Sequence, residues 1–268
     1  MLGVFMAYVI TRIFMPSALK IFESLEWTRG NFMDKELPIG TGIFLLPLGV
    51  IIPFFWYGTI SLSAIIFYGS ALMVIGLVGL YDDIFGDTKI KGFKGHFKNL
   101  LFERKITSGI IKAFAGVTIA LAGAFLFTVT SLEMVIAFLV ILLFTNAFNL
   151  FDLRPGRCIK AFFLTAVFLI AMAYSLGNNN ILLLFPILGC ILAYAPFDFK
   201  GRSMLGDAGS NAMGMSIGIV SVLVLPFMIN VVLAFALILL HWFTEKNSLN
   251  SVIENSRFLS RIDSWGRS

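Results

Sequence analysis

Five long tracts without a charged residue constrain the fold of this chain more than any other feature. They span residues 37–81, 113–132, 134–151, 161–197 and 208–244, and their lengths are 45, 20, 18, 37 and 37. A helix that crosses a bilayer needs roughly 20 apolar residues, so the three longest tracts predict two crossings each and the others predict one each. With a further crossing from residues 1 to 15, we predict about nine transmembrane helices.

Composition and turn residues support helices over other membrane architectures. Charged residues make up 13% of the chain, well below the roughly 25% of soluble domains. The tracts lack two-residue alternation, and backbone in lipid must satisfy its own hydrogen bonds, which favours helices over a barrel. Turn residues divide the long tracts at 57–59, at 177–180 and at Pro226 with Asn230. The predicted fold class is an all-α, polytopic membrane helix bundle.

The basic residues predict the orientation of this bundle. All 20 Lys and Arg residues fall in the segments 12–36, 82–112, 152–160, 198–207 and 245–267. Nine crossings place these segments on one side, which the positive-inside rule makes the cytoplasm. Every acidic residue except Glu133 lies in the same segments, so the active site is expected on the cytoplasmic face. The net charge of +5 then reflects topology, and we expect no nucleic-acid partner.

Two regions follow from these patterns. Residues 1–243 are predicted to form a transmembrane catalytic bundle embedded in the lipid bilayer. Residues 244–268 are predicted to form a cytoplasmic interfacial tail, because apolar residues there recur near helical spacing beside Arg257 and Arg261.

An acidic pair, Asp82 and Asp83, ends the third predicted helix. A helix C-terminus disfavours anions and adjacent carboxylates repel each other, so a divalent cation or a metal-bound phosphate is the natural compensation. The alternative is a solvated helix end.

A second motif contains Asn146, Asn149 and Asp152 at spacings of three, which places them on one helical face. The alternative is a face of hydrogen bonds between helices. Arg154 and Arg157 follow at the predicted helix end, where their guanidinium groups suit phosphate oxygens or act as positive-inside anchors.

A third motif, Gly206-Asp207-Ala208-Gly209-Ser210, precedes the eighth predicted helix. Its glycines allow a turn, the helix N-terminus offers amides to an anion, and Asp207 offers a hard oxygen ligand. The alternative is a helix cap by Ser210 or Asn211. Because all three motifs are predicted on one membrane face, they indicate Mg²⁺ and phosphate chemistry.

In this order the motifs resemble the polyprenyl-phosphate N-acetylhexosamine-1-phosphate transferase superfamily, glycosyl transferase family 4. It includes phospho-N-acetylmuramoyl-pentapeptide transferase and the N-acetylglucosamine-1-phosphate transferases. The likeness runs from about Asn31 to His241 and includes Leu37-Pro38 and Thr41-Gly42. It implies Mg²⁺-dependent transfer of a sugar-1-phosphate from a UDP-sugar to an undecaprenyl-type polyprenyl phosphate, with release of UMP. It also implies cell-wall or surface-polymer biosynthesis at the plasma membrane, and a homodimer is left open.

The resemblance also implies residue roles. Asp82, Asp83 and Asp207 would be catalytic, and Asp207 and Asn149 would ligate Mg²⁺. The expected substrate-binding residues are Asn146, Asp152, Arg154, Arg157, Lys94, Lys98 and His241.

Two departures from the family pattern bear on the substrate. Residues 153–157 read Leu-Arg-Pro-Gly-Arg where the family is usually Gly-rich, and His241 stands alone where the pentapeptide transferases carry a run of histidines. The second departure argues against the muramoyl-pentapeptide substrate.

Three alternatives stay open at the level of sequence. The chain could bind or transport polyprenyl phosphate without catalysis, or be a degenerate member of the family. The remote alternative is an intramembrane aspartyl protease using Asp82 and Asp207, although Met204 replaces the glycine that its second half-site needs.

Overall fold

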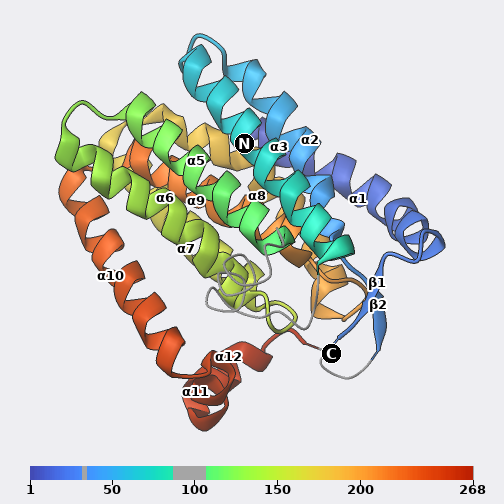
Figure 1. The fold of residues 1–268 in the computed structure, drawn as a ribbon. Coiled ribbons are helices and arrows are strands. Elements are labelled where there is room, and N and C mark those ends of the chain that lie inside the picture. The colour runs from blue at the N-terminus through green and yellow to red at the C-terminus, as the bar shows by residue number, and fades with distance from the viewer. Residues whose placement is uncertain (32–34, 87–106, 268) are drawn as a thin grey trace.

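The structure is a computed structural model that describes residues 1–31, 35–86 and 107–267. Within these residues it is a bundle of long helices with one two-stranded sheet (Figure 1). Eight helical segments are long and apolar enough to cross a membrane. They are α1 Leu2–Ser24, α3 Leu62–Phe85, α5 Ser108–Phe127, α6 Ser131–Phe151, α7 Arg157–Leu176, η4 Asn179–Leu184 with α8 Phe185–Phe199, α9 Gly206–Val224 and α10 Phe227–Lys246. The predicted all-α polytopic bundle is confirmed.

The remaining predicted crossing, at the start of the first tract, is built from short pieces. Its elements are η1 Thr41–Leu45, α2 Leu46–Ile51 and η2 Ile52–Trp56. Pro47 and Pro53 lie in the first turns of α2 and η2. Proline is tolerated in a first turn but removes the hydrogen bond that would continue a preceding helix. The prolines therefore divide this segment, where hydropathy alone predicts one helix.

Helix α9 lies inside the bundle and packs against α3 and α6 (Figure 1). Glycines bring its backbone close to α6: a Cβ added at Gly214 would lie 2.7 Å from the Cα of Thr145, and one at Gly218 would lie 2.8 Å from the Cα of Ile141. Small residues allow such close packing between transmembrane helices. These pairings make α6 and α9 antiparallel, so the start of α9 lies beside the end of α6.

Large apolar side chains cover the outside of the bundle. Phe125 on α5 is 79% exposed and Leu164 on α7 is 75% exposed. An apolar surface of this kind is unfavourable in water, whereas lipid tails are an equally apolar solvent for it. The chain is therefore a multi-pass membrane protein.

A short hairpin follows α1 at one end of the bundle. Its strands, β1 Thr28–Gly30 and β2 Glu36–Pro38, are antiparallel, with Thr28 opposite Pro38. The hairpin is joined to the bundle by hydrogen bonds at both strands. Arg29 donates to the carbonyl oxygen of Asp83 at 2.7 Å, and the N–H of Met204 donates to the carbonyl oxygen of Pro38 at 2.8 Å.

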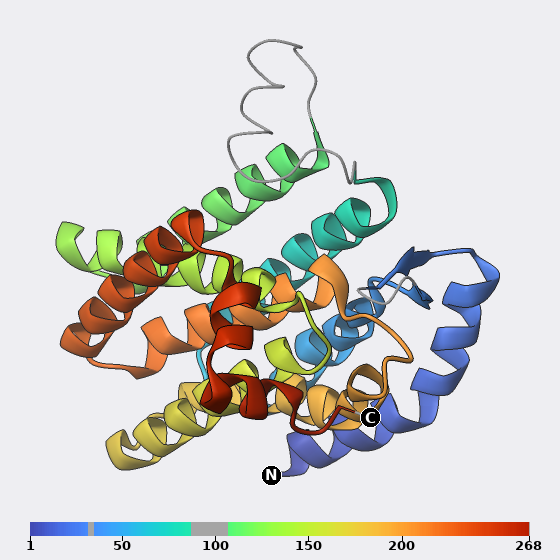
Figure 2. The ribbon, with the colours of Figure 1, turned by 90° about the horizontal axis from the view of Figure 1, so that it is seen from below.

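The C-terminal segment folds back onto the bundle. After α10, which continues to Lys246, it forms α11 Leu249–Asn255 and α12 Arg257–Ser264. Seen from below, these two helices (red) lie across the region where α6 ends and α7 begins (Figure 2). Phe258 and Trp265 stay exposed on this segment. Its predicted position at the membrane surface stays a prediction.

Candidate active site

Two carboxylates from distant parts of the chain meet at one ammonium group. Asp82 in the last turn of α3 and Asp207 in the first turn of α9 both pair with Nζ of Lys112, near the start of α5. The distance from Nζ to Oδ2 of Asp82 is 2.9 Å, and the side chains of the three residues are 18% to 21% exposed. Partial burial strengthens attraction between charges. Two of the three predicted catalytic residues therefore share a counter-charge that the motifs did not include.

Asp83 has different surroundings from its neighbour, because its carboxylate caps α9. Its Oδ1 accepts a hydrogen bond from the N–H of Asp207 at 2.9 Å, and its Oδ2 accepts one from the N–H of Ala208 at 3.0 Å. The first N–H groups of a helix lack partners within the helix, and the helix dipole favours an anion at this end. Asp83, which is buried, thus fixes the turn that carries Asp207.

Two glycines make this close approach feasible. Gly206 has a φ of +72°, and a Cβ there would lie 2.5 Å from Oδ2 of Asp83. A Cβ at Gly79 would lie 2.6 Å from the carbonyl oxygen of Asp207. Glycine adopts positive φ at low cost and leaves room for a neighbouring backbone. The glycine of the Gly-Asp motif is therefore needed for the contact between α3 and α9.

Replacing Asp83 with alanine is expected to destabilise the protein. Two N–H groups of α9 would lose their acceptor, which costs about 1–3 kcal/mol for a buried donor and lowers the Tm of a protein of this size by roughly 5 °C. Thermal unfolding in detergent measures this shift. Asp83→Asn is the matched control, because its carbonyl oxygen keeps one acceptor, and it should lower Tm by less. Equal shifts for the two variants would contradict the capping role.

The end of α6 brings Asp152 to the same region. Burial raises the pKa of Asp152 well above its ordinary value, and the carboxylates of Asp198, Asp207 and Asp83 raise it further, while the N–H of Gly206 donates to it and opposes the rise. Asp152 therefore lies close enough to the other three carboxylates to interact with them electrostatically.

The two asparagines of the same motif are placed differently from Asp152. Asn149, one turn earlier, is half-buried, and Asn146 is exposed. Within the described residues, no hydrogen bond joins the side chain of Asn149 to Asp207. Asp152 is the member of this motif that the structure brings to the carboxylates.

A polar pocket of about 200 Å³ lies beside these carboxylates. The charged residues that line it are Arg29, Asp83, Asp152, Arg154, Asp198 and Asp207. Small-molecule sites usually measure roughly 300–1,000 Å³, so this pocket accommodates part of a large ligand, such as its phosphate groups. Its lining combines carboxylates with guanidinium groups, which suits a phosphate that is bound with a cation.

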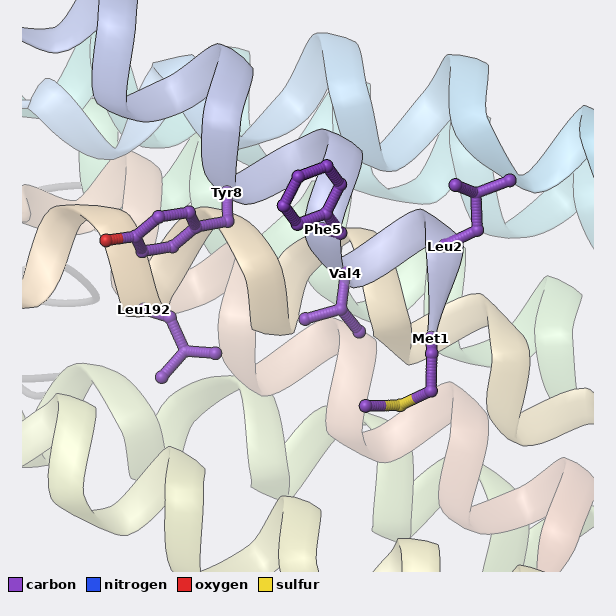
Figure 3. A pocket seen from close by; sticks show the side chains of 6 residues that line it. All are labelled: Met1, Leu2, Val4, Phe5, Tyr8 and Leu192. Atoms are coloured by element: carbon purple, nitrogen blue, oxygen red, sulfur yellow. The ribbon is translucent and has the colours of Figure 1, made fainter.

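A larger pocket of about 470 Å³ lies elsewhere, at the N-terminal end of α1. Figure 3 shows its lining of Met1, Leu2, Val4, Phe5, Tyr8 and Leu192. These residues offer an apolar surface without charge, which fits the lipid-facing side of a membrane bundle. The pocket does not contain the groups that phosphate chemistry needs.

The other predicted substrate-binding residues lie in different places. Arg154 lines the polar pocket, and its guanidinium also pairs with Glu254 at 3.0 Å. Arg157 is buried and pairs with the C-terminal segment. His241 stays with its own helix, where Nδ1 lies 2.7 Å from the carbonyl oxygen of Leu237. Lys94 and Lys98 lie outside the described residues.

Three charged residues of the site were missed by the sequence reasoning. Lys112 was counted among the basic residues that set topology, although six uncharged residues separate it from Lys105. This spacing indicates that Lys112 lies within the next transmembrane helix, where ionisable residues are usually functional. Arg29 and Asp198 gave no motif signal. Asp198 accepts a hydrogen bond from the N–H of Gly156 at 2.5 Å and so joins α8 to the segment after α6.

The donor groups fit a magnesium ion that is completed by substrate. Within the described parts of the chain, no three His, Cys, Asp or Glu side chains form a ready-made metal site. Mg²⁺, however, is usually bound by one or two carboxylates together with substrate phosphates and water. Asp82 and Asp207 offer such carboxylates, and they already converge on one positive charge.

Comparison with known families agrees with this geometry. The model of glycosyl transferase family 4 matches residues 64–225, which include the acidic pair, the Asn-Asn-Asp motif and the Gly-Asp turn. This is the family of polyprenyl-phosphate hexosamine-1-phosphate transferases, and the match confirms the predicted resemblance. No curated protein matches the chain.

Proposed function

Because the chain belongs to glycosyl transferase family 4, we propose that it transfers a sugar-1-phosphate from a UDP-sugar to polyprenyl phosphate and releases UMP. The proposed sugar is an N-acetylhexosamine, and the product is a polyprenyl-diphospho-sugar for a cell wall or another surface polymer. The distribution of basic residues supports a site on the cytoplasmic face, and the plasma membrane is the location that the family resemblance implies.

The observation that carries this proposal is the shared ion pair of Asp82, Lys112 and Asp207 beside a polar pocket. Asp82 and Asp207 are far apart in sequence, yet α3 and α9 bring their carboxylates to one ammonium group. Ionisable residues within transmembrane helices are costly and are usually functional.

The proposed reaction forms one P–O bond and breaks another. An oxygen of polyprenyl phosphate attacks the phosphorus that carries the sugar, and the bond from that phosphorus to the bridging oxygen of UMP breaks. A phosphate monoester has its second pKa near 6 and is mostly a dianion at neutral pH. A general base therefore contributes little, and the main difficulty is bringing two anions together.

The positive charges of the site and its fixed geometry would reduce the repulsion between the two anions. Lys112 offers a cation beside the carboxylates, and Arg29 and Arg154 offer guanidinium groups in the wall of the pocket. The buried cap at Asp83 fixes Asp207, so little reorganisation is needed on substrate binding.

We propose Mg²⁺ as the cofactor, held by Asp207 and Asp82. When bound there, the ion would neutralise charge on the diphosphate. Asn149, half-buried near the end of α6, is the other ligand that the family resemblance implies, and its amide oxygen is a donor of the kind that Mg²⁺ accepts.

A substrate panel tests the proposed function. Purified protein in detergent or nanodiscs is incubated with Mg²⁺, polyprenyl phosphate and labelled UDP-N-acetylhexosamines, and released UMP is measured. UMP release should require the lipid, stop with EDTA and return with added Mg²⁺. Saturable binding of polyprenyl phosphate without UMP release from any UDP-sugar would overturn the proposal and favour the alternative of a binding protein.

A further inference from the structure

The C-terminal segment, residues 247–267, is bonded to the loop that follows α6. We call residues 152–160, which are the loop 152–156 and the first turn of α7, the site loop, because Asp152, Leu153, Arg154 and Pro155 line the polar pocket. The segment crosses the site loop in Figure 2, and both α11 and α12 contribute contacts to it.

Arg157 is the centre of these contacts. Its guanidinium makes a two-pronged ion pair with Asp263, with Nε to Oδ1 at 2.8 Å and the second nitrogen to Oδ2 at 3.0 Å, and it donates to Oδ1 of Asn250 at 2.7 Å. Paired hydrogen bonds of this kind fix direction as well as distance. Arg157 is 7% exposed, so its charge is compensated by the segment.

A second group of contacts surrounds the same pair. Arg267 pairs with Asp263 at 3.0 Å and donates to the carbonyl oxygen of Pro155 at 2.7 Å. Lys160 donates to the carbonyl oxygen of Asp263 at 2.6 Å. Partial burial alone would raise the pKa of Asp263, but Arg157 and Arg267 outweigh it and hold the pKa below its ordinary value.

The electrostatics of α7 explain why these contacts are needed. Arg157 and Lys160 lie in the first turn of α7, where the helix dipole disfavours cations. Asp263 and the carbonyl groups at the end of α12 supply the compensating negative charge. Without them, two cations would face the positive end of a helix beside the site loop.

Arg154 connects the C-terminal segment to the polar pocket. Its guanidinium lines the pocket and pairs with Glu254 of α11 at 3.0 Å. Asp198 holds Gly156 from the other side of the site loop. The loop is thus fixed at one side by the bundle and at the other by the C-terminal segment.

We propose that the C-terminal segment is a working part of the site, and that Asp263 is a positioning residue that holds the site loop for binding of the anionic part of the nucleotide-sugar. The assignment to substrate binding rests on the proposed function, whereas the docking of the segment on the loop does not.

Two measurements on the full chain test this inference separately. Hydrogen exchange compares the wild type with Asp263→Ala, Asp263→Glu and Arg261→Ala. Amides of residues 156–160 should exchange at least about tenfold faster in Asp263→Ala and recover partly in Asp263→Glu. Arg261, exposed on the same helix, is the matched control, and its replacement should leave exchange unchanged. Unchanged exchange in Asp263→Ala would overturn the docking role.

Kinetics then tests the link to substrate. In Asp263→Ala, KM for the UDP-sugar should rise about tenfold while kcat changes by less than about threefold. A merely structural defect would lower kcat by reducing the amount of active protein and leave KM unchanged, which would overturn the positioning role.

Arg157→Ala and the double variant should resemble Asp263→Ala, since the two residues act as one pair. If the wild type releases no UMP, the proposed function fails, and the exchange result still decides whether the segment holds the loop.

Discussion

Replacing Asp207 with asparagine is expected to lower UMP release at least about 100-fold, the usual effect of removing one preorganised charged or polar group from a transition-state site. The asparagine side chain would keep the shape of the aspartate but lose the charge that pairs with Lys112 and the oxygen proposed for Mg²⁺. The backbone N–H at this position would still donate to Asp83, so the cap of α9 is retained. Tm should therefore stay within about 3 °C of the wild type.

Glu133→Gln is the matched control for this prediction. Glu133 belongs to the capping box at the start of α6, away from the end that carries Asp152, and glutamine preserves a capping box. The same carboxylate-to-amide change should therefore leave UMP release unchanged. Activity of Asp207→Asn within about threefold of the wild type would remove Asp207 from the proposed mechanism.

The bundle was predictable because the bilayer leaves few solutions for an apolar chain. Uncharged tracts long enough to cross it must form helices, and their ends coincide with turn residues such as Gly177 and Pro226. The divided segment between Thr41 and Trp56 was less accessible, because hydropathy measures apolar character and not the local effect of Pro47 and Pro53.

The site was predictable in part for a related reason. Asp82 and Asp83 stand out because adjacent carboxylates are disfavoured at a helix C-terminus, and Asp207 stands out because it lies in a Gly-Asp turn at a helix N-terminus. Their different environments could not be read from sequence, since Asp82 pairs with Lys112 while Asp83 caps α9 only after α3 and α9 have packed. The same holds for Arg157, whose partner Asp263 is contributed by a segment about a hundred residues later.

Replacing Lys112 with methionine is expected to have two effects that together test the centre of the site. UMP release should fall about 100- to 1,000-fold, because the proposed mechanism uses this cation beside the attacking and leaving phosphates. The protein without Mg²⁺ should also be destabilised by about 1–3 kcal/mol, since Asp82 and Asp207 would face each other without a counter-charge.

Magnesium should then stabilise Lys112→Met more than it stabilises the wild type. In the wild type, the ammonium of Lys112 lies between the two carboxylates where Mg²⁺ is proposed, so it competes with the ion. In Lys112→Met this competition is absent. Tm is measured with and without Mg²⁺ for the wild type, Lys112→Met and Lys112→Arg, because a ligand that binds the folded state raises Tm. Lys112→Arg keeps the charge and should behave like the wild type in this assay. An equal rise in Tm with Mg²⁺ in all three proteins would place the ion away from Asp82 and Asp207. A larger rise in Lys112→Met alone would show that Mg²⁺ and the ammonium of Lys112 bind at the same position between the carboxylates.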